Sequence, residues 1–419
     1  MKRFFLLTLA SAALLGASAA PVKTYEVKSP DGRLALVLTA GERLSFTVAR
    51  DGETLVAPSE MALTLSTGEV LGESPRVRSA RRRAVTETID APLYRQSRFD
   101  AAYNELDLRL RGDYGILARA YDDGVCYRFY TERDGELTIV DETAQLNFEG
   151  DPSAYIPYSK TEIPMRTSFE NTYEYAPLSK FRTQTVAFMP VLVDLGERGY
   201  VLYTESDVEA YPGVYLTYDK EAKGFAARFA ECPTETSLTK RFQDVVERSA
   251  DYIARVDGRR SYPWRIVAYA ATATELPVND MVWQTAEASR VADASWVRDG
   301  KIAWDWWNNW GVYGVDFKSG INTETYKYFI DFAAANGIEY VALDEGWGVR
   351  DGDVMHVVPE IDLPEIVSYA REKKVGIILW VVAKVLDDKL EEACRYYSEL
   401  GVAGWKVDFI DRQDQAAVE

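Results

Sequence analysis

Hydrophobic and polar positions alternate in short runs over the first part of the chain, and turn residues separate these runs. Leucines at 34, 36 and 38 begin one run, and two more runs at 44–48 and 54–56 flank Asp51-Gly52. Two further runs, 116–121 and 125–130, flank Asp122-Asp123-Gly124. Aspartate-glycine between alternating runs is a strong hairpin signal. The pattern predicts an antiparallel β-sandwich of unusual size, a super-sandwich, over residues 20–275.

The pattern changes from residue 276 onward, where short apolar runs alternate with stretches of helical period. Strands are predicted at 302–304, 340–343, 375–382 and 403–407. Helices are predicted at 323–335, capped by Asn322, from Asp362 to about 374, and at 387–400, closed by Gly401.

This repetition of strand and helix predicts parallel strands joined by right-handed crossovers. We expect residues 276–419 to form the N-terminal half of a (β/α)8 (TIM) barrel, an incomplete barrel with four of its eight units. A doubly wound open sheet is the alternative. No glycine-rich phosphate loop follows any strand, and charged and aromatic residues cluster at the strand ends, which favours the barrel.

The composition restricts the chemistry and the partners. The formal net charge is −18, so nucleic acid and anionic membrane surfaces are poor partners. His356 is the only histidine, which argues against Ser-His-Asp catalysis and against sites with several histidine ligands. The chemistry therefore rests on carboxylates, lysine or tyrosine. The sequence gives no account of the oligomeric state.

The first nineteen residues have the pattern of a signal peptide. Lys2 and Arg3 precede an apolar run at 4–15 and a cleavage site at Ala17-Ser18-Ala19. The apolar run is too short to span a bilayer, and no later run is long enough. We expect an exported protein, periplasmic or secreted, cleaved near Ala19.

Three predicted strands end in acidic and aromatic residues, which a barrel would bring to one mouth. Carboxylates hydrogen-bond to hydroxyls, and indole faces cover the apolar face of a sugar, so the mixture suits a carbohydrate. The alternative is that the tryptophans belong to the core. The three segments are Trp304-Asp305-Trp306-Trp307-Asn308, Asp344-Glu345-Gly346-Trp347 and Lys406-Val407-Asp408.

The last of these segments places Lys406 and Asp408 two residues apart, on one face of the fourth strand. A neighbouring cation lowers the pKa of a carboxyl, so Asp408 is expected to stay ionised, as a nucleophile must. Paired carboxylates carry out most glycoside hydrolysis. A structural ion pair that closes the strand is the alternative.

From about Tyr25 to Gln415 the chain resembles glycoside hydrolase family 97, a group of exported bacterial α-glycosidases. The motifs that carry the resemblance are Ala120-Tyr-Asp-Asp-Gly-Val125, Glu205-Ser-Asp-Val-Glu-Ala-Tyr-Pro212, Trp304-Asp-Trp-Trp-Asn308, Leu343-Asp-Glu-Gly-Trp347 and Lys406-Val-Asp-Phe-Ile-Asp-Arg412. Inverting α-glucosidase members have glycine where Asp408 stands. Retaining α-galactosidase-like members have an aspartate there, which serves as their nucleophile.

The resemblance implies that Asp408 is the nucleophile and that Lys406 contacts the substrate. Glu345 matches a base glutamate of the inverting members and is expected here to bind sugar or tune Asp408. The acid/base glutamate is expected beyond Glu419, so this chain by itself is expected to be inactive and truncated at its C-terminus. The predicted substrate-binding residues are Asp305, Trp307, Asp344, Glu345, Trp380 and Lys406.

The resemblance also implies a calcium ion near the sugar, with one glutamate ligand from the sandwich. The segment 167–174 is expected to supply this ligand, with Glu170 preferred over Glu174. The other ligands are expected beyond residue 419.

The resulting hypothesis is an exo-acting retaining α-glycosidase, an α-galactosidase, that acts on oligosaccharides or other α-galactosides. Two alternatives stay open: an inverting α-glucosidase of the same family, and a carbohydrate-binding protein without turnover. The exact sugar and linkage do not follow from the sequence.

Overall fold

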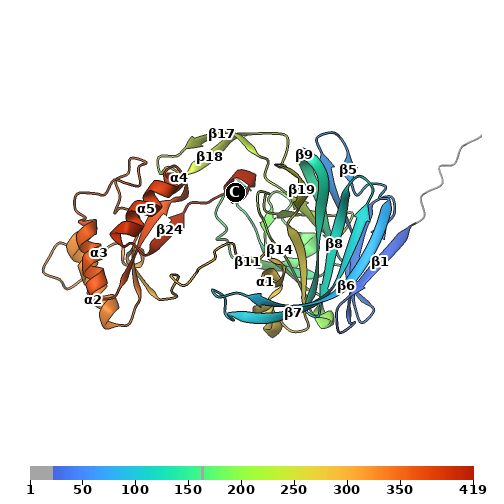
Figure 1. The fold of residues 1–419 in the computed structure, drawn as a ribbon, viewed down its shortest axis with the longest axis horizontal. Helices are drawn as coiled ribbons and strands as arrows, with labels where there is room; N and C mark the ends of the chain where they lie inside the picture. The colour runs from blue at the N-terminus through green and yellow to red at the C-terminus, as the bar shows by residue number, and fades with distance from the viewer. Residues whose placement is uncertain (1–21, 162–164) are drawn as a thin grey trace, which may run out of the picture.

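The computed structural model describes residues 22–161 and 165–419, which form a β-sandwich and a smaller α/β part (Figure 1). The predicted signal peptide, residues 1–19, lies outside the described residues, and export therefore stays a prediction. Among the described residues, no helix has the length and apolar character that crossing a membrane requires.

Two series of antiparallel strands build the sandwich, and the long strand β9 (Gly124–Asn147) belongs to both. The first series is β1 (Lys23–Lys28), β2 (Leu34–Ala40), β3 (Leu44–Arg50), β4 (Glu53–Leu65), β9, β16 (Gly224–Arg228), β15 (Tyr215–Asp219) and β12 (Ala187–Phe188). The second series is β6 (Val77–Asp90), β7 (Arg98–Leu110), β8 (Tyr114–Tyr121), β9, β20 (Trp264–Ala270), β14 (Tyr200–Ser206), β13 (Val191–Asp194), β10 (Ser153–Pro157) and β11 (Tyr173–Pro177). Strands β5 (Val70–Leu71) and β19 (Ala254–Ser261) pair with β4 and β9, and η1 (Leu178–Lys180) and η2 (Gly196–Arg198) lie in the loops.

The predicted hairpins of the sandwich are confirmed. Strands β3 and β4 pair up to Arg50 and Glu53, which leaves Asp51 and Gly52 as a two-residue turn. Both turn residues have positive φ, 50° and 87°, as a turn matched to the strand twist requires. The alternate leucines of β2 are buried in the sandwich core, so the period-2 pattern gave the correct buried face.

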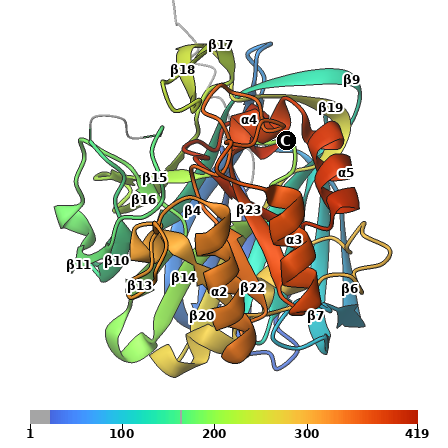
Figure 2. The ribbon, with the colours of Figure 1, turned by 90° about the vertical axis from the view of Figure 1, so that its left-hand side faces the viewer.

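The α/β part contains four parallel strands that lie side by side in chain order. They are β21 (Ile302–Trp304), β22 (Tyr340–Leu343), β23 (Gly376–Val382) and β24 (Gly404–Asp408). Helices α2 (Thr323–Ala335), α3 (Leu363–Glu372) and α5 (Leu390–Leu400) pack on one face of this sheet (Figure 2). This arrangement agrees with the first half of a barrel, since a doubly wound sheet carries helices on both faces. Closure into eight strands stays a prediction.

The predicted ends of these helices are confirmed by their caps. The Asn322 and Asp362 side chains accept hydrogen bonds from main-chain N–H groups in the first turns of α2 and α3. Gly401, at φ 108°, ends α5.

The helix predicted at 387–400 is wrong at its start. The structure has two helices, α4 (Ala383–Asp387) and α5, separated at Lys389, whose φ of −137° is not helical. The Lys389 ammonium group bonds to Asp353 in the preceding loop, 2.7 Å away, and this long-range contact has no counterpart in the local pattern.

Three segments connect the sandwich with the α/β part. The first contains η3 (Ala273–Val278) and α1 (Met281–Thr285), whose Met281 is buried against the sandwich; the domain boundary expected at residue 275 stays a prediction. The second is a hairpin of β17 (Pro233–Leu238) and β18 (Asp244–Ser249) that reaches from the sandwich toward α4 (Figure 1). The third follows β24 and returns to the sandwich, where α6 (Gln415–Val418) lies.

Candidate active site

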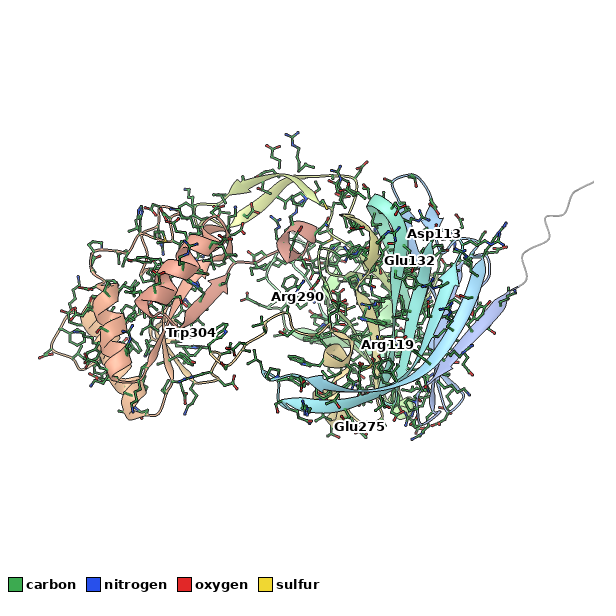
Figure 3. The ribbon with its side chains drawn as sticks, viewed as in Figure 1. Asp113, Arg119, Glu132, Glu275, Arg290 and Trp304 are labelled. Carbon is green, nitrogen blue, oxygen red and sulfur yellow. The ribbon has the colours of Figure 1, made fainter. Side chains whose placement is uncertain are left out.

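The carboxyl ends of the four parallel strands lie along one edge of the sheet, and this edge holds the predicted strand-end residues. Register pairs Trp304 with Ala342 and Val382 with Asp408. Beyond β21 the chain turns through η4 (Asp305–Asn308). Figure 3 labels Trp304 at the end of β21 and Arg290 in the segment that joins the two parts. The structure therefore brings the three predicted acidic strand ends together.

Asp408 ends β24 with its carboxylate held by three donors. The Trp380 indole N–H donates to Oδ2 over 2.9 Å, and the main-chain N–H of Phe409 donates to Oδ1 over 2.8 Å. The Lys406 ammonium lies 3.3 Å from Oδ2. Burial raises the pKa of Asp408, but these donors together outweigh it and hold the pKa below its usual value. The side chain remains 40% exposed, so Asp408 is both ionised and accessible.

Lys406 bridges two carboxylates rather than pairing with Asp408 alone. Its Nζ lies 2.9 Å from Oδ2 of Asp344, which is closer than its distance to Asp408. It also lies 4.6 Å from the centre of the Trp304 ring, whose indole N–H donates to the same Asp344 oxygen. The carboxyl ends of β21, β22 and β24 thus meet around the ammonium group of Lys406.

Asp305 and Asp344, which were both predicted to contact substrate, are buried, and their contact with substrate stays a prediction. Asp305 has no exposed surface; it accepts hydrogen bonds from the Tyr326 hydroxyl at 2.7 Å and from the main-chain N–H of Asp344 at 3.1 Å. Burial raises the pKa of Asp305 to about 6. The Asp344 side chain is also buried and is occupied by Trp304 and Lys406. Both carboxylates support the strand ends and leave little surface for a sugar.

Glu345 lies between two arginines. Arg241, from the loop between β17 and β18, and Arg350 each approach its carboxylate to 3.0 Å. Sequence reasoning missed Arg241 because it lies more than a hundred residues away, in the sandwich. The available signal was a basic and aromatic hairpin tip, Lys240-Arg241-Phe242.

The tryptophans at the mouth differ in exposure. Trp304 and Trp306 stack, with ring centres 5.2 Å apart, and Trp307 packs edge-on against both. Trp307 is 74% exposed, so it offers a free aromatic surface. Trp380 is nearly buried, and its polar edge points at Asp408. Trp307, for which a core position was the alternative, is thus exposed, and its contact with a sugar stays a prediction.

A pocket of about 70 Å³ adjoins this site, between the tip of the β17–β18 hairpin and the ends of β22 and β23. Arg241 and Phe242 line it on the sandwich side, and Glu345, Trp347 and Trp380 line it on the other. Asp408 is not a lining residue, so the pocket lies on the Glu345 side of the predicted nucleophile.

The two predicted calcium ligands have different surroundings. Glu174 pairs with the Arg182 guanidinium group, whereas Glu170 is exposed and makes no ion pair among the described residues. Glu170 also lies close enough to Asp411 to raise the pKa of that aspartate, which burial raises first and Asp408 raises further. Residues 22–161 and 165–419 contain no group of three acidic, cysteine or histidine side chains that could hold a metal ion.

Family models match most of the chain. Residues 27–287 match the model described as glycosyl-hydrolase 97 N-terminal, and residues 306–419 match the model described as glycoside hydrolase 97.

Two curated relatives are similar over almost the whole chain. One is a retaining alpha-galactosidase of Bacteroides thetaiotaomicron, 42% identical over 402 residues, which are 94% of this chain and 61% of the relative. Another is a probable retaining alpha-galactosidase of Streptomyces bingchenggensis, 30% identical over 92% of this chain and 56% of the relative. The chain thus spans about three fifths of the length of these relatives.

Solved structures share the fold. A glycoside hydrolase family 97 enzyme from Pseudoalteromonas sp. strain K8, in complex with acarbose, matches with a TM-score of 0.77 at 19% identity, over 92% of this chain and 59% of that chain. A beta-arabinopyranosidase matches with a TM-score of 0.74 at 22% identity, over 94% of this chain and 63% of that chain.

Proposed function

This chain belongs to glycoside hydrolase family 97, and from that premise we propose that the complete protein is an exo-acting retaining α-galactosidase. The observation that carries the proposal is the Asp408 carboxylate, which is ionised, accessible and fixed at the end of β24. The 42% identity to a retaining alpha-galactosidase supports the same activity.

Asp408 is the best candidate nucleophile among the carboxylates at the strand ends. Asp305 and Asp344 are buried and bonded within the protein. Glu345 is held between Arg241 and Arg350. A nucleophile needs a free lone pair directed at the anomeric carbon, and Asp408 keeps exposed surface for that contact.

The proposed reaction proceeds in two displacements. In the first, a carboxylate oxygen of Asp408 attacks the anomeric carbon of a terminal α-galactoside, the bond from that carbon to the glycosidic oxygen breaks, and a glutamic acid protonates the departing oxygen. In the second, the resulting glutamate takes a proton from water, the water oxygen attacks the anomeric carbon, and Asp408 leaves. Two inversions keep the anomeric configuration.

The roles of the remaining residues follow from their positions. Lys406 keeps Asp408 anionic and presents part of its ammonium group to the mouth. Trp307 offers an aromatic face for the apolar side of the sugar. The acid/base glutamate is proposed to lie beyond Glu419, about 5 Å from Asp408 in the complete protein, as retaining enzymes require.

Calcium remains part of the proposal. An exposed glutamate free of any ion pair among the described residues, close to Asp411, suits a hard cation that prefers carboxylate oxygens. Glu170 would therefore supply one ligand and further ligands would come from beyond residue 419. Bound calcium would supply positive charge next to the sugar hydroxyls. As a ligand, Glu170 would connect the sandwich with the ion.

The stereochemistry of the product tests this function. The complete gene product is mixed with p-nitrophenyl α-galactoside, and proton NMR follows the first anomer released, which should be α. Asp408→Asn should abolish turnover, whereas Asp387→Asn, which removes an exposed carboxylate on α4, should not. A β product would remove Asp408 from the nucleophile role, and hydrolysis of α-glucosides alone would favour the inverting α-glucosidase. Sugar binding without turnover would favour a binding protein.

A further inference from the structure

The tip of the β17–β18 hairpin is a defined loop that carries sandwich residues to the predicted nucleophile. The main-chain N–H of Thr239 donates to the carbonyl of Gln243 over 3.0 Å, and that of Phe242 donates to the carbonyl of Thr239 over 3.0 Å. These bonds close the tip. Figure 1 shows the hairpin extending from the sandwich to the α/β part.

The residues of this tip contact the α/β part at several points around Asp408. The Phe242 ring lies against Gly352, where an added Cβ would approach it to 3.0 Å. The Gln243 side-chain amide donates to Asp411 over 3.2 Å, and Asp244 pairs with Arg412. Contacts of the residues that follow Arg241 in the sequence therefore hold the tip in position.

Arg241 makes two contacts from this tip. Its guanidinium group bonds to the Glu345 carboxylate at 3.0 Å, and its Cζ lies 4.6 Å from the centre of the Phe409 ring. A guanidinium over an aromatic ring is an attractive arrangement, and arginine forms it better than lysine because its group is planar.

Phe409 follows Asp408 directly and has an unfavourable backbone conformation. Its φ is 63°, in the left-handed region that bulky residues avoid, and such a conformation persists only where the surroundings hold it. Its N–H donates to Oδ1 of Asp408 over 2.8 Å. The ring packs edge-on with Trp380, at 5.8 Å and 86°, and the Arg241 guanidinium lies over it.

We propose that Arg241 is a positioning residue for Asp408. By holding the Phe409 ring against Trp380 while anchored on Glu345, Arg241 keeps Phe409 in its left-handed conformation and keeps the Trp380 indole N–H on the nucleophile carboxylate. The sandwich thereby contributes to the orientation of the nucleophile without touching the substrate. This inference rests on the proposed role of Asp408 as nucleophile.

Loss of Arg241 should affect the chemical step more than substrate binding. Without Arg241, Phe409 relaxes toward negative φ, its ring moves away from Trp380, and the indole that donates to Oδ2 of Asp408 loses this packing, so the carboxylate gains rotational freedom. Misplacement of a reacting group by about 1 Å lowers a rate by about a hundredfold. We therefore expect Arg241→Ala to lower kcat by about ten- to a hundredfold with little change in KM.

The experiment measures kcat and KM on p-nitrophenyl α-galactoside for the complete gene product and five variants, among them Arg241→Ala. Arg241→Lys should recover only part of the loss, because a compact ammonium pairs with Glu345 but does not stack on Phe409 as a guanidinium does. Arg248→Ala is the matched control: it removes an arginine of the same hairpin, paired with Glu235, and should leave kcat unchanged. Phe409→Gly removes both the ring and the strain, and adding Arg241→Ala to it should cause no further loss.

A crystal structure of Arg241→Ala gives a readout that does not depend on the substrate. In it, Phe409 should have left the left-handed region, its ring should have moved from Trp380, and the Trp380 indole N–H should no longer hold Oδ2 of Asp408 at 2.9 Å. Retention of φ near +60° and of the Oδ2 bond, or a kcat equal to that of Arg248→Ala, would overturn the inference. Absence of galactosidase activity in the unsubstituted protein would instead contradict the proposed function. The crystal structure would still show whether Arg241 holds the Phe409 ring in place. If Arg241→Ala does not fold, Arg241→Lys and Phe409→Gly carry both tests.

Discussion

Replacing Trp380 by phenylalanine isolates one hydrogen bond to the predicted nucleophile. The indole N–H donates to Oδ2 of Asp408 over 2.9 Å, and phenylalanine keeps an aromatic ring beside Phe409 while it removes this donor. The lost bond stabilises the charged form of Asp408, so its removal raises the pKa. Bonds to charged groups contribute about 1.5–3 kcal/mol. Because Asp408 is 40% exposed, water replaces part of the bond and the lower figure applies, which corresponds to about one pH unit.

The assay is the pH dependence of kcat/KM, whose acidic limb reports the ionisation of the nucleophile in the free enzyme. The acidic limb of the Trp380→Phe variant should lie about one pH unit higher than that of the unsubstituted protein. Trp405→Phe is the matched control, because Trp405 lies on β24 and packs on Trp347 and Tyr397. An unchanged acidic limb in Trp380→Phe, with the fold intact, would refute the view that this bond keeps Asp408 ionised.

Three further predictions concern the groups around Asp408. Lys406→Met should lower the free energy of unfolding by about 2 kcal/mol in urea titrations, because it leaves the buried Asp344 carboxylate without its cation. This figure is below the usual cost of breaking a buried ion pair because Lys406 is partly exposed. Burial raises the pKa of Asp305 to about 6, so its contribution to stability is full below the unfolded pKa near 3.8 and is lost as the pH rises through 6. Asp305→Asn should therefore reduce, by about 2 kcal/mol, the fall in the free energy of unfolding between pH 4 and pH 7, measured by urea titration. Glu170→Gln should weaken calcium binding in isothermal titration calorimetry by tenfold or more, whereas Glu174→Gln should not; equal effects would contradict the assignment.

Much of the fold follows from local signals. The Asp51-Gly52 turn, the caps at Asn322 and Asp362 and the terminating Gly401 are each determined by a few neighbouring residues, and each is found where the sequence predicts it. The start of α5 is different. It depends on a bond between Lys389 and a loop more than thirty residues earlier, so the local pattern gave one helix instead of two.

The candidate site likewise has features that the local pattern predicts and features that it does not. Lys406 and Asp408 share a face of one strand, and alternation alone places them together. Alternation shows which way a side chain points but not how deep it lies, so the burial of the Asp305 carboxylate could not be predicted. The contact of Arg241 with Glu345 could not be predicted from the local pattern, since it depends on how the sandwich meets the α/β part.

The position of β24 argues that the sandwich is part of the catalytic apparatus and not a separate module. Among the described residues, β24 pairs with β23 alone, so its ladder fixes one side of the strand that carries Asp408. The chain beyond it is bound to the sandwich: the Gly213 N–H donates to the Gln413 carbonyl over 2.9 Å, and the Gln415 amide donates to the Arg255 carbonyl over 2.7 Å. Arg241 approaches the same strand end from the hairpin. The nucleophile candidate is therefore held between a strand of one part and two segments bound to the other, and changes that separate the parts should lower the rate before they unfold either one.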